Sequence, residues 1–358
     1  MGAIFAPAHT ARLTFHAACL TFCDMPTKHA PPPAPAEGTI RVKQAAPRTV
    51  GFLLVPGFAL MSYAAAIEPL RAANLLSGQE LYRWWHAAPG GKPVTASNGV
   101  AIIPDCGTNT ERAADMVFVC AGGNPALFED RSVFAWLRRL ARKGVAIGGI
   151  SGGPYILAKA GLLDERRATL HWEHLPAFRE AFPDVAVVPS LFEIDGNRIT
   201  CSGGISALDM MVAIIEKDHG RQLAAAVGDW FLHTHVREGF GPQRMDLRYR
   251  LGIADEKLLS VLRAMEASIE TPLSRSSLAL EAGISLRQLE RMFRRHIGHG
   301  IHRHYRWLRL ERARQLLRET TLPVLDVALA TGFASASQFA RAYARAFGEP
   351  PSRTRVSG

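Results

Sequence analysis

The pentapeptide 149–153 (GISGG) has the G-x-S-x-G spacing of a nucleophile elbow. In hydrolases with this elbow, the serine stands on a sharp turn between a strand and a helix, and a histidine oriented by an acid removes its proton. The first downstream histidine, His171, follows Ser151 by only 20 residues, which leaves little chain for the acid. A serine hydrolase or amidase that uses Ser151 is therefore the alternative hypothesis, and we expect no working triad.

Two further segments combine glycine with a small polar residue. They are 122–124 (GGN) and 202–204 (SGG), and each follows an apolar run, as GISGG does. Glycine lets a ligand approach backbone amides, and a helix that begins at such a point favours an anion such as a carboxylate. Each segment alone is also an ordinary tight turn. Three of them at one edge of a sheet predict a ligand pocket.

The elements that carry these segments alternate between strands and helices. The residue pattern predicts strands at 49–55, 115–120, 146–150 and 198–201, and helices at 62–76, 131–143, 153–160 and 206–219. This alternation is typical of a parallel sheet with helices on both faces. In such sheets ligands bind at the carboxyl ends of the strands, where all three segments lie. We predict an α/β domain, flavodoxin-like or amidotransferase-like, over residues 49–217.

The C-terminal part of the chain carries a helix-turn-helix pattern at 277–298. Leu289, Met292, Phe293 and Ile297 have the spacing of a buried helical stripe, and Ser285 stands where an N-cap accepts a hydrogen bond from helical amides. The residues that then face outward are Arg287, Glu290, Arg291 and Arg294. Placed in the major groove, such a helix presents arginine to guanine edges, while neighbouring arginines contact phosphates.

The same pattern recurs about fifty residues later. A shift of 50 positions lays Leu289 on Phe339 and Phe293 on Tyr343. In this second copy we expect burial of Phe339, Ala342, Tyr343, Ala346 and Phe347, and an outward face of Ser335, Ser337, Gln338 and Arg341. Two such units in one chain can read successive major-groove faces of double-stranded DNA about 34 Å apart. The prediction is an all-α domain with two helix-turn-helix motifs.

The charge is concentrated in the same region. Residues 255–358 contain 17 Lys and Arg against 10 Asp and Glu, whereas the preceding residues contain 25 against 22. Lys257 is the only lysine among the 17. Arginine favours bidentate contacts with phosphate and guanine, so the charge pattern indicates a nucleic-acid partner.

Residues 273–353 resemble the DNA-binding domain of the AraC/XylS family of bacterial transcription regulators, most specifically at 323–348 and in the Pro350-Pro351-Ser352 that follows. The resemblance implies operator DNA, RNA polymerase and a second copy of the chain as partners, with activation as the expected effect. It implies base-reading positions at Arg287, Glu290, Arg291, Ala336, Ser337 and Arg341, with Arg303 and Arg306 assigned to phosphates. The predicted DNA-contacting set is Ser285, Arg287, Glu290, Arg291, Arg294, Arg303, Arg306, Ser335, Ala336, Ser337, Gln338 and Arg341.

Residues 49–217 resemble the class I glutamine amidotransferase-like domain of the PfpI type, through residues 151–172 and Glu68, and the fusion resembles the GlxA group of AraC regulators. Catalytic relatives carry cysteine at the elbow, where this chain has Ser151, so the resemblance implies a domain that binds and does not catalyse. It also implies a small amine or amino-acid-like effector, such as a betaine, carnitine or an arginine-like compound. The predicted ligand-binding set is Glu68, Gly123, Asn124, Ser151, Gly152, His171, Trp172, Ser202 and Gly203. Glu68, Trp172 and either Trp84 or Trp85 are the candidates to face the cationic group of the effector, although for each tryptophan alone we favour core packing.

The remaining features limit the partners. The longest apolar run falls well short of the roughly 18 residues of a membrane span, and the five cysteines show no CxxC pair, so a cytoplasmic protein is expected. The histidines at 296–304 lack the spacing of a metal site, and we expect them to be solvated or to face phosphates. No cofactor and no metal are predicted.

The domain boundaries follow from these patterns. We predict a disordered leader at 1–48, a ligand-sensing domain at 49–217, a linker helix with a basic tail at 218–255 and a DNA-binding domain at 256–353. Residues 1–24 are expected to be dispensable, with Met25 as the alternative start.

Overall fold

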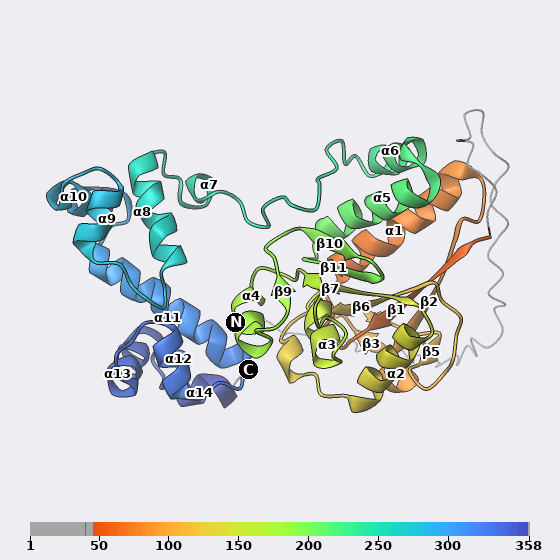
Figure 1. Cartoon of the computed structure of the whole chain (residues 1–358), viewed down its shortest axis with the longest axis horizontal. Helices are drawn as coiled ribbons and strands as arrows, with labels where there is room; N and C mark the ends of the chain where they lie inside the picture. The colour runs from red at the N-terminus through yellow and green to blue at the C-terminus, as the bar shows by residue number, and fades with distance from the viewer. Residues whose placement is uncertain (1–39, 41–45, 357–358) are drawn as a thin grey trace, which may run out of the picture.

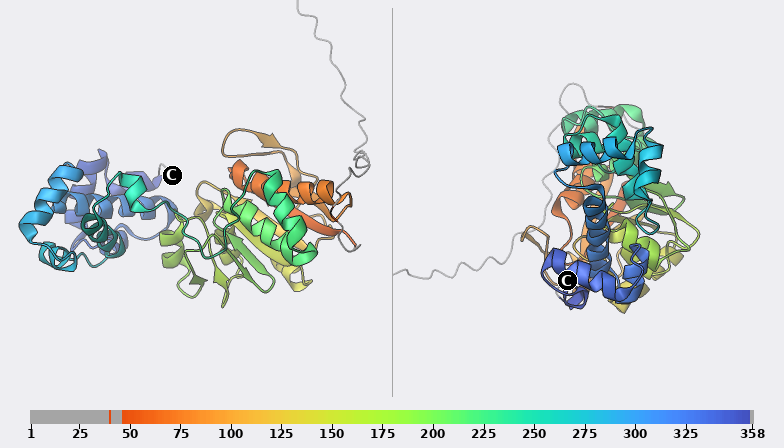
Figure 2. Two further views of the ribbon diagram at one scale, coloured as in Figure 1. Left: turned by 90° about the horizontal axis from the view of Figure 1, so that it is seen from above. Right: turned by 90° about the vertical axis from the view of Figure 1, so that its left-hand side faces the viewer.

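The computed structural model describes residue 40 and residues 46–356. The expected leader therefore lies almost entirely outside the described residues, as does the alternative start at Met25. Residues 48–230 form a domain built on a sheet, called here the sheet domain, and residues 247–356 form a helical domain. Figures 1 and 2 show the two as separate lobes joined by a connecting segment, residues 231–246.

The main sheet has seven strands in the order β10-β11-β7-β6-β1-β2-β5. Their bounds are β1 Arg48–Leu54, β2 Tyr82–Ala88, β5 Cys106–Gly107, β6 Met116–Ala121, β7 Ala146–Ser151, β10 Phe192–Asp195 and β11 Arg198–Cys201. All neighbours pair in parallel except β10, which runs antiparallel to β11 at one edge. Two small ribbons accompany it: β3 Val94–Thr95 with β4 Ala101–Ile102, and β8 Arg167–Ala168 with β9 Ala186–Val187.

Helices cover both faces of this sheet (Figure 1). One face packs on α1 Leu60–Ser77, α5 Ser206–His219 and α6 Arg221–Trp230, and the other on α2 Arg131–Arg142 and α3 Gly153–Lys159. The alternation of β1 makes this possible, because Phe52 joins the first core and Leu53 the second. The predicted fold class, a mostly parallel sheet between helices, is confirmed. The remaining elements of the sheet domain are α4 Leu175–Ala181 and the short 3-10 turns η1 Pro89–Gly91 and η2 Pro125–Leu127.

The expected linker helix is part of the sheet domain. Leu223, Ala224 and Val227 of α6 are buried in the core that α1 and α5 share with the sheet. At the other end of the predicted linker, Leu247 of α7 (Leu247–Leu251) is buried in the helical domain. The apolar residues at both ends explain the correction, because each packs into a core and only residues 231–246 remain between the two. The other predicted boundaries stay predictions.

The helical domain contains two small cores that share one long helix. The first is formed by α8 Glu256–Ala267, α9 Arg275–Glu281 and α10 Leu286–His296, and the second by α12 Val324–Ala330, α13 Ala336–Phe347 and α14 Pro351–Val356. Helix α11, Ile301–Glu319, contributes its first residues to the first core and its last residues to the second. Its position between the two groups is plain in Figure 1. Within the described part of the chain, no helix is both long and apolar enough to cross a membrane.

Candidate functional site

Ser151 stands at a strained strand-to-helix turn. It ends β7, is 8% exposed, and has a φ of 61°, a left-handed backbone that residues other than glycine seldom adopt. Helix α3 begins two residues later so close to β6 that a Cβ on Gly153 would lie 2.1 Å from the carbonyl oxygen of Val119. The packing of α3 against β6 therefore holds Ser151 in this conformation, as the elbow pattern predicts.

Two residues from other elements lie against Ser151. Gly203, with a φ of 90°, is so close that a Cβ there would lie 2.7 Å from Cβ of Ser151 and 2.9 Å from Oγ of Ser62. The Ser62 hydroxyl, from the first turn of α1, accepts a hydrogen bond from the Gly204 amide at 2.7 Å. Sequence analysis missed Ser62, because a single serine in a helix carries no signal of what it will face. Ser62, Ser151 and Gly203 form the elbow site.

The structure does not bring Glu68 to the elbow site. Glu68 pairs with Arg71 at 2.7 Å and its side chain is 43% exposed. Six residues separate it from Ser62, and at about 100° per residue the two side chains leave α1 in different directions. Glu68, predicted as a ligand-binding residue, is therefore not the residue of α1 that lies at the elbow site; that residue is Ser62.

The other predicted glycine segments lie at the same sheet edge, but their polar groups form hydrogen bonds with other groups of the protein. Ser202 donates its hydroxyl to the Leu191 carbonyl at 2.9 Å and lies 2.8 Å from the Ser206 hydroxyl. The Gly152 amide donates to the Ala121 carbonyl at 3.1 Å. Gly123 has a φ of 60°, and Asn124 after it caps the η2 turn through the Ala126 amide. Ser202 is thus a support of the elbow site and has no free hydroxyl proton for a ligand in this arrangement.

His171 and Trp172 begin a loop that is tied to the elbow. The His171 amide donates to the Ser151 carbonyl at 3.3 Å, and burial, followed by nearby His174, lowers the pKa of the His171 ring. Among the described residues no hydrogen bond joins the Ser151 hydroxyl to a histidine. The Trp172 ring is covered on one side by the Arg244 guanidinium, 4.3 Å from its centroid. The arrangement therefore lacks an assembled serine–histidine pair.

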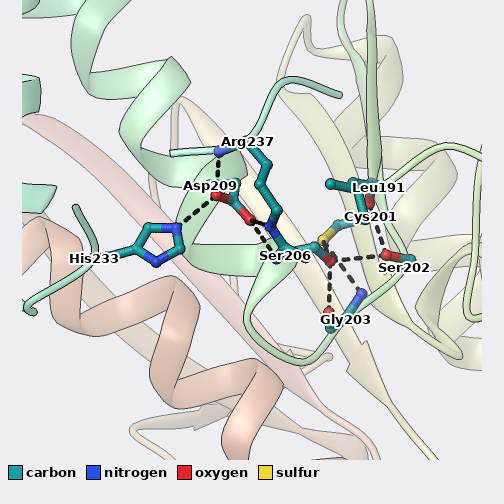
Figure 3. A network of polar contacts seen from close by, with 8 residues as sticks. All are labelled: Leu191, Cys201, Ser202, Gly203, Ser206, Asp209, His233 and Arg237. Carbon is teal, nitrogen blue, oxygen red and sulfur yellow. Dashed lines mark hydrogen bonds and ion pairs between the residues drawn. The ribbon is translucent and has the colours of Figure 1, made fainter. Parts of the chain in front are cut away.

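Figure 3 shows two groups of polar contacts that share helix α5, one around Gly203 of the elbow site and one between Asp209 and the connecting segment. Ser206 donates to the Gly203 carbonyl at 2.5 Å, and one turn further along α5 the fully buried carboxylate of Asp209 accepts from His233 at 2.7 Å. Asp209 also accepts from the Arg237 amide at 2.8 Å and from its guanidinium at 2.6 Å. This carboxylate holds the connecting segment against the helix that begins beside Gly203.

A second link joins the sheet domain directly to α11. His174 lies 3.2 Å from the carboxylate of Glu319, and both side chains are buried. The Asn124 side-chain amide donates to the Arg318 carbonyl at the end of the same helix. Ala177 of α4 is buried in the second core of the helical domain. Asn124, predicted as a ligand residue, thus contacts the helical domain.

The first helix-turn-helix has the expected geometry. Gly283 makes the turn with a φ of 62°, and Ser285 caps α10 through a capping box with Gln288. Leu289 and Phe293 are fully buried, while Arg287, Arg291 and Arg294 are exposed. Glu290 is paired with Arg275 at 3.2 Å, so its carboxylate is already engaged.

The second helix-turn-helix repeats this geometry. Ser335 caps α13 through the Gln338 amide, Phe339 and Tyr343 are fully buried, and Ser337, Gln338 and Arg341 are exposed. Ala336 is partly buried. The Arg341 guanidinium donates to the Ser337 hydroxyl at 2.9 Å. The expected burial of Ala346 is wrong, because it lies on the exposed side of the last turn of α13.

The histidines at 296–304 were expected to be solvated or to face phosphates, and His304 does not meet this expectation. His302 is exposed, but His304 is buried against the rings of Phe293 and His299, and burial lowers its pKa to about 4. His304 lies near the start of α11 on the side that packs against the first core, which explains why it is buried. No group of His, Cys, Asp or Glu suited to a metal ion is found among the described residues.

Comparison with known proteins agrees with this division. Residues 48–217 match the DJ-1/PfpI family, and residues 278–357 match a helix-turn-helix domain family. The HTH-type transcriptional regulator GlxA of Rhizobium meliloti is 47% identical over 308 residues, which cover 86% of this chain and 95% of that protein. The HTH-type transcriptional regulator CdhR of Pseudomonas aeruginosa is 44% identical, with 85% and 90% covered. The chain belongs to the GlxA family of HTH-type transcriptional regulators.

This GlxA-family member is a DNA-binding transcriptional regulator. Its relatives do not support the serine-hydrolase alternative. A solved THiJ/PfpI family protein from Pseudomonas syringae, 20% identical with a TM-score of 0.50, covers 72% of this chain and is itself 97% covered, and it shows the fold alone.

Proposed function

We propose that this regulator binds a small amine or amino-acid-like effector in the elbow site, without catalysis, and that the bound effector changes its affinity for operator DNA. The compounds that fit the proposal carry a carboxylate and a cationic nitrogen, as betaines, carnitine and arginine do. Ser62 and Ser151 supply hydroxyls for the carboxylate, and Gly203, which lacks a side chain, lets the two serines approach each other. The absence of a hydrogen-bonded base at Ser151 in the described structure supports binding over turnover.

The observation that carries the proposal is a series of contacts from the elbow site to α11, the helix that joins the two helix-turn-helix motifs. The loop that starts with the His171 amide on the Ser151 carbonyl ends at His174, which contacts Glu319 of α11. A ligand that favours one position of this loop must favour one placement of α11. By linkage, operator binding then changes effector affinity by the same factor.

On the DNA side, we propose that α10 and α13 enter successive major grooves. Arg287, Glu290 and Arg291 would read bases from the first helix, and Ala336, Ser337 and Arg341 from the second. The exposure of the three arginines and of Ser337 supports this assignment. Contacts to phosphate are assigned to Arg294, Arg303 and Arg306, with Ser285, Ser335 and Gln338 at the helix starts.

We further propose a homodimer that activates transcription in the cytoplasm through contact with RNA polymerase. Exposed large apolar side chains on and around the connecting segment, which a second copy would cover, support a dimer. They are Trp230, Leu232, Val236, Phe240, Met245, Tyr249 and Leu251. Sedimentation equilibrium of the full chain tests this: a monomer at micromolar concentration would contradict it.

A thermal-shift screen of the full chain against betaines, carnitine, arginine and amines tests the effector class, because a ligand that binds only the folded state raises the melting temperature. We expect a hit that Ser151→Ala weakens by about 0.5–1.5 kcal/mol, the value of one hydrogen bond, with a similar loss for Ser62→Ala. Glu68→Gln is the matched control, since Glu68 lies away from the elbow site. If the purified protein consumed the compound, and Ser151→Ala abolished that consumption, the binding-only proposal would fail.

A further inference from the structure

A cleft of about 610 Å³ lies between the two domains, away from the elbow site and from the reading helices. Its walls come from the loop after His171, the connecting segment, α7, the end of α8 and α11. Two indoles, Trp172 and Trp307, line it, and both are partly exposed, at 38% and 49%. The cleft therefore joins apolar ring faces with the charged groups of α11.

One of the charged groups that line the cleft is Arg312. This arginine is partly buried, and burial, together with nearby Arg179 and Arg244, lowers the pKa of its guanidinium. Among the described residues, no carboxylate lies within ion-pair distance of Arg312. The two acids whose charge it feels are engaged elsewhere, Glu319 with His174 at 3.2 Å and Glu266 with Arg250 at 3.4 Å.

Neighbouring donors in the same wall also lack acceptors. The buried Nε atom of Arg314 and the buried side-chain amide nitrogen of Gln315 have no hydrogen-bond partner, and both residues line the cleft. A partly buried guanidinium without a counter-charge and orphaned buried donors are costly in a folded protein. Glu173 and Glu311 also line the cleft, so the positive and negative charges around it nearly cancel. Recognition of an anion therefore depends on the local contact with Arg312.

We propose that this cleft binds a small organic oxyanion, a carboxylate or a phosphate ester, with the anionic group on Arg312 and the organic part against Trp172 and Trp307. A guanidinium presents two parallel donors that match either oxyanion, and an indole face contacts the rest of the ligand. Because the walls belong to both domains, a bound anion stabilises this placement of the domains. The proposal does not depend on the elbow site.

The test is calorimetric titration of the full chain at constant ionic strength with three probes: benzoate, inorganic phosphate and choline. Benzoate tests a carboxylate with a ring, phosphate tests the anionic group alone, and choline is a cation of comparable size. We expect benzoate or phosphate to bind at one site, choline not to bind there, and Arg312→Gln to weaken the anion at least about tenfold. Arg142→Gln, an exposed arginine on α2, removes the same charge far from the cleft and should change nothing.

Two further variants keep the result interpretable if Arg312→Gln is unstable. Arg312→Lys retains the charge without the planar pair of donors and should bind the anion with intermediate affinity, and Trp307→Phe should weaken benzoate more than phosphate. Equal anion binding by the wild type and both Arg312 variants would overturn the proposal, as would the absence of binding at millimolar anion. Displacement of benzoate by a short duplex of random sequence would also overturn it, because the cleft would then belong to the DNA surface. Ser62→Ala, which tests the elbow site, should leave the titration unchanged.

Discussion

In the proposed DNA complex, single arginines distinguish recognition of the base sequence from attraction to the phosphate charge. Arg291 and Arg341 are exposed on the two reading helices, and neither forms an ion pair among the described residues. If each contacts a guanine edge, Arg291→Ala or Arg341→Ala should reduce affinity for a selected operator by about 1–3 kcal/mol, with much less effect on random DNA. Duplexes selected from a random library supply the operator for competition binding.

Arg303→Ala is the control for that experiment, because we assign Arg303 to a phosphate. Its loss should weaken operator and random duplex alike and reduce the salt dependence of binding. An unchanged operator-to-random ratio for Arg291→Ala would show that Arg291 does not read a base.

The buried ring of His304 makes stability depend on pH. Its pKa is about 4 in the folded protein against 6.5 for an exposed histidine, with burial as the main cause and His299 as the second. Above pH 6.5 the ring is neutral in both states. As the pH falls from 6.5 toward 4, His304 becomes protonated in the unfolded chain but stays neutral in the folded chain. The free energy of unfolding therefore falls.

We expect this contribution to be on the order of 1–3 kcal/mol across that range. Chemical denaturation of wild type and His304→Phe between pH 7.5 and 5 measures it, since phenylalanine fills the site without titrating. His86, His171 and His219 also have lowered pKa values, so the informative quantity is the difference between the two slopes. His302→Phe, at an exposed position, should keep the wild-type slope.

At the scale of elements, the two reading helices begin with caps of different strength. At α10, Ser285 and Gln288 satisfy each other's backbone amides, whereas at α13 only the Ser335 hydroxyl accepts a bond, from Gln338. Ser285→Ala should destabilise the helical domain by about 1 kcal/mol, and Ser335→Ala by no more than that. Ser285→Asp retains the acceptor and should recover most of the loss, while Ser337→Ala, inside α13, should change the melting temperature little. A larger loss from Ser335→Ala than from Ser285→Ala would contradict this ranking.

The elements that the sequence predicts well are those with a single dominant pattern. The strands β6 and β7 are short apolar runs and α5 carries clear helical periodicity, so their limits lie within one residue of the expectation, and the limits of β11 agree with it. Strand β2 (YRWWHAA) was not predicted, because arginine and histidine interrupt its apolar residues. Its burial comes from tertiary packing: Trp85 lies over Gly51 of β1, where any Cβ would be 2.5 Å from the ring, which confirms core packing for Trp85.

The residues of the candidate site show the same difference between features with a local sequence pattern and features that depend on tertiary contacts. Ser151 was found because its neighbours form a local motif, and the reading helices because their pattern repeats. Ser62 and Asp209 escaped notice, because each matters only through partners that lie far away in the chain: Gly204 for Ser62, and His233 and Arg237 for Asp209. The resemblance to PfpI-type domains predicts a ligand-binding role for Glu68, but its position on α1 directs its side chain to Arg71 instead.

On the scale of the whole molecule, the contact between His174 and Glu319 should hold the two domains in this arrangement. Glu319→Gln keeps the shape of the side chain and removes the charge, leaving His174 buried with a weaker partner. We expect hydrogen–deuterium exchange in α4 and in the last turn of α11 to become several-fold faster, because local opening then requires less free energy. Glu281→Gln, at an exposed position in α9, is the control. Unchanged exchange in both segments would show that the contact between His174 and Glu319 does not hold the domains together.

In the proposed complex, the length of α11 sets the spacing of the two helix-turn-helix motifs along the operator. A helix of 19 residues is about 28 Å long at 1.5 Å per residue, close to the 34 Å of one DNA turn. Once the first reading helix is bound, this rigid rod keeps the second near its own half-site at a high effective concentration, so the two weak contacts act as a bivalent ligand. Such avidity depends on geometry alone. Five base pairs inserted between the half-sites turn the second one to the opposite side of the duplex, and affinity then falls to that of a single motif although every base contact is still available.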